Sequence, residues 1–175
     1  MALPKATRAF WKGWAAALAV ALLPAVLATL PPFLGVAGRA LLMQAFASVC
    51  HQLPAYSPHL GGVQLAVGHR VYGILWGLSL GTIAFLWLRR WDDALDRHAA
   101  LALGTAALPM ALDWGLHAAG WWAKTPASRL ATGLLFGLAA GYFLTRAIVD
   151  LVAGPSAAAV QGPRHDAVSP DPISP

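Results

Sequence analysis

The sequence predicts an all-α, polytopic membrane protein with about four transmembrane helices and a structured extracytoplasmic loop. Apolar residues make up 58% of its 175 residues, and charged residues make up only 11%. An ordinary globular domain has about 25% charged residues, so this chain has too few charges to cover a water-facing surface. Four separate apolar segments are long enough to cross a bilayer. Lipid is therefore the expected solvent for much of the chain.

The four spans are predicted over about residues 14–30, 71–88, 99–121 and 130–152, within a membrane domain of residues 14–152. Residues 1–13 form a basic N-terminus. Residues 153–175 are rich in proline and lack apolar periodicity, which predicts a disordered tail.

The start of the chain has a second interpretation. Three basic residues followed by an apolar run resemble a signal peptide, with Val26-Leu27-Ala28 as its cleavage site. Pro24 and the length of the apolar run favour a membrane anchor that is retained.

The outer loop covers residues 31–70 and contains an apolar stretch, Phe33 to Val49, which carries Arg39 and Gln44. Because a charge at mid-bilayer is costly, we expect a helix that lies in the interface or packs re-entrantly. A fifth span over this stretch is the alternative.

Lysine and arginine residues are divided unequally between the two sides of a four-span arrangement. One side receives eight and the other receives four. Cytoplasmic segments carry the excess of basic residues, so both termini are predicted to be cytoplasmic and the loop 31–70 to face outward. The basic residues beside Trp87 and Trp91 are typical of headgroup anchoring and not of nucleic-acid binding.

Glycines recur at a spacing of four in the second and fourth spans. This spacing places them on one helix face, where a missing side chain lets another backbone approach closely. Both segments also begin with an arginine, which suggests a parallel repeat of two-helix units; coincidence between apolar helices is the alternative. The glycines are Gly73, Gly77, Gly81, Gly133, Gly137 and Gly141.

The only cysteine lies in the segment Cys50-His51-Gln52-Leu53-Pro54 of the outer loop. Cysteine and histidine are ligands for zinc and copper, so the pair indicates a metal site that His59, His69 or His117 could complete. In the structural interpretation, His51 and Gln52 bond to loop backbone and Cys50 packs as a small apolar residue.

Asp113 and His117 lie four residues apart in the third span and share a helix face. A carboxylate inside a bilayer is costly unless it is neutral or paired. The pair therefore indicates a proton, ion or ligand-orienting site, or a structural bond between helices in which Arg70, Tyr72 or Arg129 pairs with Asp113.

Several spaced motifs in this chain resemble those of a family of small bacterial integral membrane proteins known as domain of unknown function 2085. Family members carry Cys-His-Gln-x-Pro, Gly-x-Gln, Cys-x-Arg-Cys-Thr-Gly, Pro-Met-x-x-Asp-Gly-x-x-Gln and Arg-x-x-Thr-Gly, in that order. The resemblance covers roughly Val49 to Gly141 and implies a location in a bacterial inner membrane. The matching residues are Cys50, His51, Gln52, Pro54, Gly62, Gln64, Arg70, Gly73, Pro109, Met110, Asp113, Arg129, Thr132 and Gly133.

The chain departs from the family pattern at three positions. Gly68 and Val71 stand where the family has its paired cysteines, and His117 stands where it has a glutamine. Three thiols would resemble a metal or redox site, but this chain retains one. The family has no established activity, so the resemblance implies no reaction.

These observations predict a small, non-enzymatic accessory or structural subunit of a larger membrane complex, in contact with lipid and with other subunits or a second copy. The alternative is a zinc-, copper- or haem-binding membrane protein with ligands drawn from Cys50, His51, His69, Asp113 and His117. A membrane enzyme or transporter is the third hypothesis. The structural polar residues in the first interpretation are Gln52, Gln64, Arg70, Asp113 and Arg129.

Overall fold

The computed structural model describes residues 5–123 and 125–154, so the predicted tail from residue 155 onward lies outside the described residues. Its long helices are α1 (Lys5–Thr29), α3 (His69–Leu88), α5 (Ala99–Ala118) and α6 (Pro126–Ala153). Each is long and apolar enough to cross a membrane. The protein is thus an all-α membrane protein in which, over the described residues, four helices could span the bilayer.

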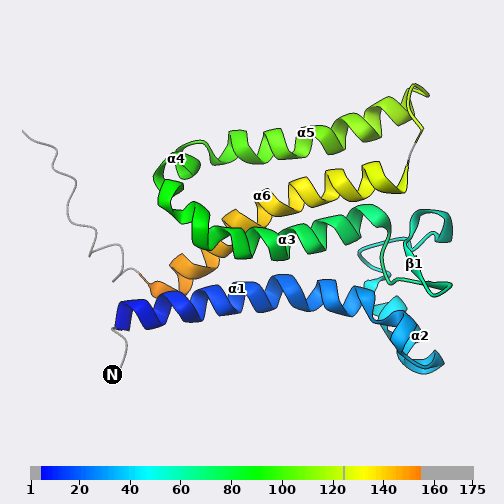
Figure 1. Ribbon diagram of the computed structural model, residues 1–175, viewed down its shortest axis with the longest axis horizontal. Helices are drawn as coiled ribbons and strands as arrows, with labels where there is room; N and C mark the ends of the chain where they lie inside the picture. The colour runs from blue at the N-terminus through cyan, green and yellow to red at the C-terminus, as the bar shows by residue number, and fades with distance from the viewer. Residues whose placement is uncertain (1–4, 124, 155–175) are drawn as a thin grey trace, which may run out of the picture.

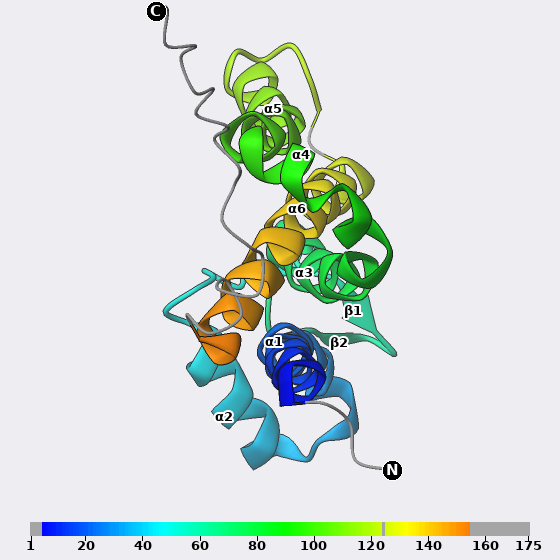
Figure 2. The same ribbon diagram turned by 90° about the vertical axis from the view of Figure 1, so that its left-hand side faces the viewer.

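The four helices lie side by side in the order α5, α6, α3, α1, and two views at right angles agree on this order (Figures 1 and 2). The contact between α3 and α6 is the most extensive, whereas α5 packs mainly on α6. The segment that joins α1 to α3 covers one end of the bundle, which we call the loop end (Figure 1). The loop end is therefore where a site outside the apolar layer could form.

The helix boundaries follow local chemistry. α1 already includes Lys5, the first described residue, and so extends beyond the predicted span, because lysine and arginine are good helix formers. α5 ends at Ala118, before the predicted Trp121, because Gly120 adopts φ +77°. The backbone amide of Trp121 then donates a hydrogen bond to the Leu116 carbonyl at 2.9 Å. The backbone amide of Gly120 donates to the His117 carbonyl, also at 2.9 Å. This Schellman arrangement closes the helix.

α6 starts at Pro126, at the first helical position that proline favours. Thr125 caps it, because its hydroxyl accepts a hydrogen bond from the Ser128 amide at 3.0 Å. At the other end the chain leaves α6 at Gly154, which adopts φ +68°.

The outer loop contains more structure than the sequence predicts. α2 (Val36–Phe46) has eleven residues, so it is too short to span a bilayer. None of its side chains is buried, so it exposes an apolar surface. Two 3-10 turns, η1 (Pro31–Phe33) and η2 (Pro54–Tyr56), flank it. A two-stranded hairpin follows, β1 (His59–Leu60) and β2 (Val63–Gln64). Its turn residues Gly61 and Gly62 both adopt positive φ, as a tight hairpin turn requires.

α3 and α6 run parallel and touch backbone to backbone. A methyl group added at Gly73, Gly77 or Gly81 would overlap the carbonyl oxygen of Leu130, Leu134 or Leu138, respectively. The contacts are reciprocal, because additions at Gly133, Gly137 and Gly141 would overlap carbonyl oxygens of α3. We call this contact the glycine seam. Such close approach favours dispersion and weak Cα–H···O contacts between the two backbones.

α1 packs against α3 and α6 through small residues of its own. Gly13 lies against the Val149 backbone, and Ala17, Ala21 and Ala25 are fully or almost fully buried. These residues recur every four positions, so they share one face. The same spacing rule that identifies the glycine seam would have found this face in the sequence.

Away from the loop end, polar contacts join α1 to α3 and α3 to α6. The Trp14 indole N–H donates to the Thr82 carbonyl at 3.0 Å. The fully buried hydroxyls of Thr82 and Thr145 lie 2.9 Å apart. Each hydroxyl also bonds to the backbone of its own helix, so these groups are satisfied inside an apolar layer.

The end of the bundle opposite the loop end is charged. The short segment after α3 contains η3 (Arg89–Trp91) and α4 (Asp92–Arg97). Arg146 of α6 lies 3.0 Å from Asp96 and 3.5 Å from Asp92. The Tyr142 hydroxyl donates to Asp92 at 2.6 Å. These contacts tie the α3–α5 connection to α6.

Replacing Gly137 with alanine should destabilise the protein. The added methyl would overlap the Ile74 carbonyl and the Gly77 Cα, forcing α3 and α6 apart. We expect a loss of about 1–3 kcal/mol in the free energy of unfolding, as for other overpacked contacts. Thermal unfolding in mild detergent would measure it.

The matched control is Gly104→Ala on α5, where an added methyl meets no neighbouring atom of the described chain within 4 Å. Because alanine is the better helix former, this change should leave stability unchanged or raise it. Equal stability of the two variants would contradict a tight glycine seam.

Candidate functional site

The segment Cys50 to Pro54 folds as a structural connection at the loop end. Gln52 adopts φ +52°, which turns the chain sharply after α2. Its side-chain amide donates to the carbonyls of Met43 at 2.6 Å and Ala66 at 2.8 Å. Gln52 therefore links the end of α2 to the segment that leads into α3.

Two further hydrogen bonds close this connection. The side-chain amide of Gln64 donates to the backbone carbonyl of Gln52 at 2.6 Å. The backbone amide of Gly68 donates to the Cys50 sulfur at 3.2 Å. Cys50 is thus placed against the start of α3, where an added methyl at Gly68 would come within 3.6 Å of the sulfur and 3.1 Å of the Tyr56 carbonyl.

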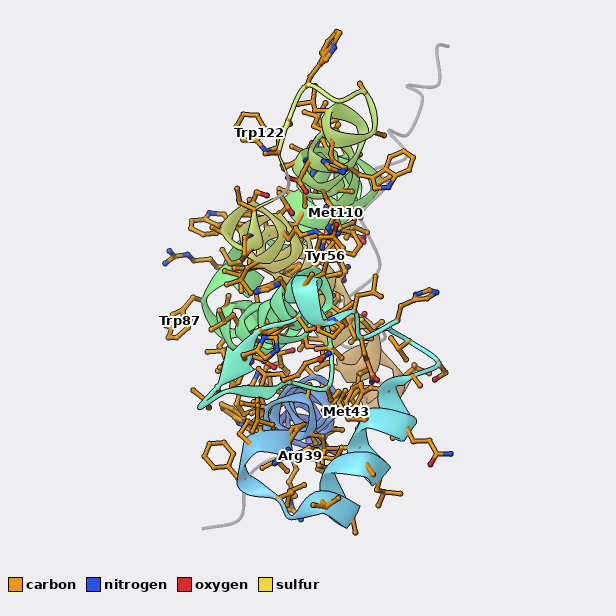
Figure 3. All side chains as sticks on the ribbon, turned by 90° about the vertical axis from the view of Figure 1, so that its right-hand side faces the viewer. Arg39, Met43, Tyr56, Trp87, Met110 and Trp122 are labelled. Atoms are coloured by element: carbon orange, nitrogen blue, oxygen red, sulfur yellow. The ribbon has the colours of Figure 1, made fainter. Side chains whose placement is uncertain are left out.

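A pocket of about 240 Å³ lies between this segment and the first turns of α3 and α6. Tyr56 lies at this end of the bundle (Figure 3). Apolar side chains of the outer loop form part of the pocket wall, and the polar part includes two arginines and two histidines. The polar and aromatic lining residues that matter below are Cys50, Gln52, Tyr56, His69, Arg70 and Arg129.

Arg70 forms an ion pair with Asp113 that joins α3 to α5. The two side chains approach to 2.5 Å, and the Asp113 side chain is 5% exposed while that of Arg70 is 22% exposed. The sequence leaves three candidate partners for Asp113, namely Arg70, Tyr72 and Arg129, and in the structure the partner is Arg70. The pairing compensates a carboxylate that would be costly by itself within an apolar layer.

Arg129 takes a different position, with its guanidinium over the Tyr56 ring, 4.3 Å from the ring centre. Such a cation–π contact leaves the N–H edge of the guanidinium available to other acceptors. Arg129 forms no ion pair with any residue that the structure describes, and its Nε is buried without a hydrogen-bond partner there.

The histidines of the predicted metal set are held by backbone groups or face outward. His69 Nδ1 lies 2.8 Å from the Tyr56 carbonyl, and His117 Nδ1 lies 3.0 Å from the Trp122 carbonyl. His51 and His59 are exposed. Across residues 5–123 and 125–154, no three His, Cys, Asp or Glu side chains gather where they could hold a metal ion. The geometry therefore gives the predicted metal site no support.

Sequence reasoning missed two contributors to this site. Tyr56 accepts from His69 through its carbonyl and carries Arg129 on its ring, and no pattern in the sequence indicates either contact. The hairpin that positions Gln64 was also missed, although Gly61-Gly62 between two short extended segments is a recognisable turn signal.

Comparisons with known proteins agree with the membrane fold. A family model described as "Predicted membrane protein (DUF2085)" matches residues 50–143. The uncharacterized protein MJ1492 of Methanocaldococcus jannaschii is 24% identical over 111 residues, which cover 63% of this chain and 70% of that protein. No solved structure matches the chain.

Replacing Asp113 with asparagine should destabilise the bundle, because Arg70 would keep its charge and lose its partner. We expect a loss of about 3 kcal/mol in the free energy of unfolding. Adding Arg70→Gln should recover part of this loss, since no unpaired charge then remains. Thermal unfolding of the two single variants and the double variant forms the cycle that measures the coupling.

The control is Asp96→Asn, because Asp96 is 61% exposed and pairs with Arg146 at the opposite end. We expect it to cost at most about 1 kcal/mol. Additive losses at Arg70 and Asp113 would show that the pair does not connect α3 to α5.

Proposed function

The chain belongs to the DUF2085 family of predicted membrane proteins, and we propose that it is a non-enzymatic subunit that packs through α5 against another membrane protein. The observation that carries this proposal is the difference in packing between the glycines of α5 and those of α3 and α6. Those of α3 and α6 meet the neighbouring backbone, whereas an added methyl group at Gly104 or Gly115 of α5 would have no neighbouring atom within 4 Å among the residues that the structure describes.

The open face of α5 points away from the bundle. Ala111 lies seven residues after Gly104, and Gly115 lies eleven residues after it, so the three residues share one helix face. Asp113, which reaches Arg70, lies on the opposite face. Only 6% of the α5 span is buried, compared with 22–33% for the other three spans.

Small residues distinguish a protein-packing face from a lipid-facing one. Lipid contact is satisfied by large apolar side chains, whereas a groove of glycine and alanine lets a second helix approach its backbone closely. Leu108 lies on the same face, seven residues before Gly115, and Leu101 lies about one turn before Gly104; the two leucines are 54% and 68% exposed. This combination of small residues and exposed leucines on one face supports a transmembrane helix of another subunit as the occupant.

The polar groups at the loop end support a structural role for that region. Gln52, Gln64 and Cys50 are engaged with backbone groups, and Arg70 is engaged with Asp113. Each contact joins elements that are separate in the sequence. We therefore propose that the family motif in this chain holds the loop on the bundle.

We also propose a location in a bacterial inner membrane with both termini in the cytoplasm. The support is the excess of lysine and arginine at the end that carries the N-terminus and the α3–α5 connection, together with the positive-inside rule. In this orientation the loop end faces outward.

The proposal predicts a specific cross-link from α5. A photo-cross-linking amino acid at Ala111 should give one discrete adduct with another membrane protein in native membranes, because Ala111 lies in the open groove. Gly115→Leu should abolish this adduct by filling the groove. Electrophoresis, mass spectrometry and reciprocal purification of the partner would identify it.

The control position is Leu23 on α1, which is 59% exposed and lies outside the groove. We expect no discrete adduct from it. An adduct made only of two copies of this chain would assign the groove to self-association, and the absence of any adduct from Ala111 would contradict the proposal.

A further inference from the structure

We propose that the pocket at the loop end binds a phosphate oxyanion, with the headgroup phosphate of an anionic lipid as its source. This proposal does not depend on the role of α5, since the pocket lies among Cys50–Ser57 and the first turns of α3 and α6. Three independent features carry it: the charge of the lining, the direction of α3 and the apolar part of the wall.

The lining carries positive charge that is incompletely compensated. Arg70 and Arg129 both line the pocket, and none of its lining residues within the described part of the chain is an aspartate or glutamate. Asp113 pairs with Arg70 from outside the lining. The Nε atoms of both arginines are buried without a hydrogen-bond partner among the described residues. A guanidinium presents its N–H donors as a planar fork that matches phosphate oxygens. The Nε atoms are buried, so an oxyanion in the pocket would accept from the terminal N–H groups of these arginines.

α3 directs its positive end toward the pocket. His69, Arg70 and Val71 of its first turn line the pocket, whereas α6 contributes the Arg129 side chain and has its Ser128 amide capped by Thr125. The first N–H groups of a helix have no partner within the helix, and the helix dipole adds positive potential there. The start of α3 therefore acts in the same direction as the two arginines.

The wall also has an apolar part, formed by Val49, Leu53 and Val71. A fully hydrated inorganic ion would gain nothing from this surface, whereas a lipid has apolar groups next to its phosphate. The pocket lies where the spanning helices α3 and α6 begin, which is the depth of the headgroups in a bilayer. A lipid headgroup therefore fits the whole lining better than free phosphate does.

The direct test is lipid retention by the intact chain, measured by native mass spectrometry after release from nanodiscs of phosphatidylcholine with or without phosphatidylglycerol. We expect wild-type protein to retain phosphatidylglycerol in preference to phosphatidylcholine, and the preference to weaken as salt is raised. Arg129→Gln should reduce retention about tenfold, the value of one charge-assisted contact. Arg129→Lys, which keeps the charge, should retain most of it.

Arg39→Gln is the matched control, because Arg39 lies at the same end on α2 and donates to the Pro31 carbonyl outside the pocket. It should bind lipid as the wild type does. Circular dichroism would establish that each variant is folded. A second arm adds inorganic phosphate in phosphatidylcholine alone: binding that Arg129→Gln abolishes supports the oxyanion pocket and assigns it to free phosphate. Equal retention by Arg129→Gln, Arg39→Gln and wild type in both arms would overturn the proposal.

Discussion

The backbone contact between α3 and α6 is the constraint on which the rest of the structure depends. Each glycine of the seam faces a carbonyl oxygen of the other helix, and equivalent glycines are sixty positions apart in the sequence. This reciprocity gives the two parallel helices a local two-fold relation. Because they are parallel, their first turns meet at one end. The pocket, the Arg70–Asp113 pair and the Arg129–Tyr56 contact all lie at that end.

A bilayer explains why the structure uses small residues and a few polar bonds in place of a large apolar core. Lipid tails are as apolar as leucine, so burying leucine between helices gains little. Close packing through glycine and alanine gains dispersion energy, and the Thr82–Thr145 contact and the Arg70–Asp113 pair add directional bonds. α1, α3 and α6 pack against one another through glycine and alanine. Over the described residues, α5 is held by α6 and by the ion pair with Arg70, and its Gly104 and Gly115 meet no neighbouring atom there.

Much of the fold can be predicted from the sequence because periodicity and composition report it directly. Apolar length predicts the four spanning helices, and the fourfold spacing of the glycines predicts a packing face. The partner of Asp113 could not be predicted, since helical spacing fixes a face and not which of Arg70, Tyr72 and Arg129 reaches it. The role of Tyr56 depends on the path of an irregular loop, for which the sequence has no repeating signal. The family match begins at Cys50, and the geometry around this residue is that of a connection between elements.

Gly77 and Gly137 lie in backbone contact, and a solid-state NMR measurement in lipid bilayers can test this contact directly. In protein labelled with carbon-13 at the glycine Cα, we expect a strong through-space cross-peak between Gly77 and Gly137, because a methyl group built on Gly77 would lie 2.8 Å from the Gly137 Cα. Absence of this cross-peak, in spectra where other glycine pairs at similar separation are seen, would contradict the glycine seam and the arrangement of the loop end that follows from it.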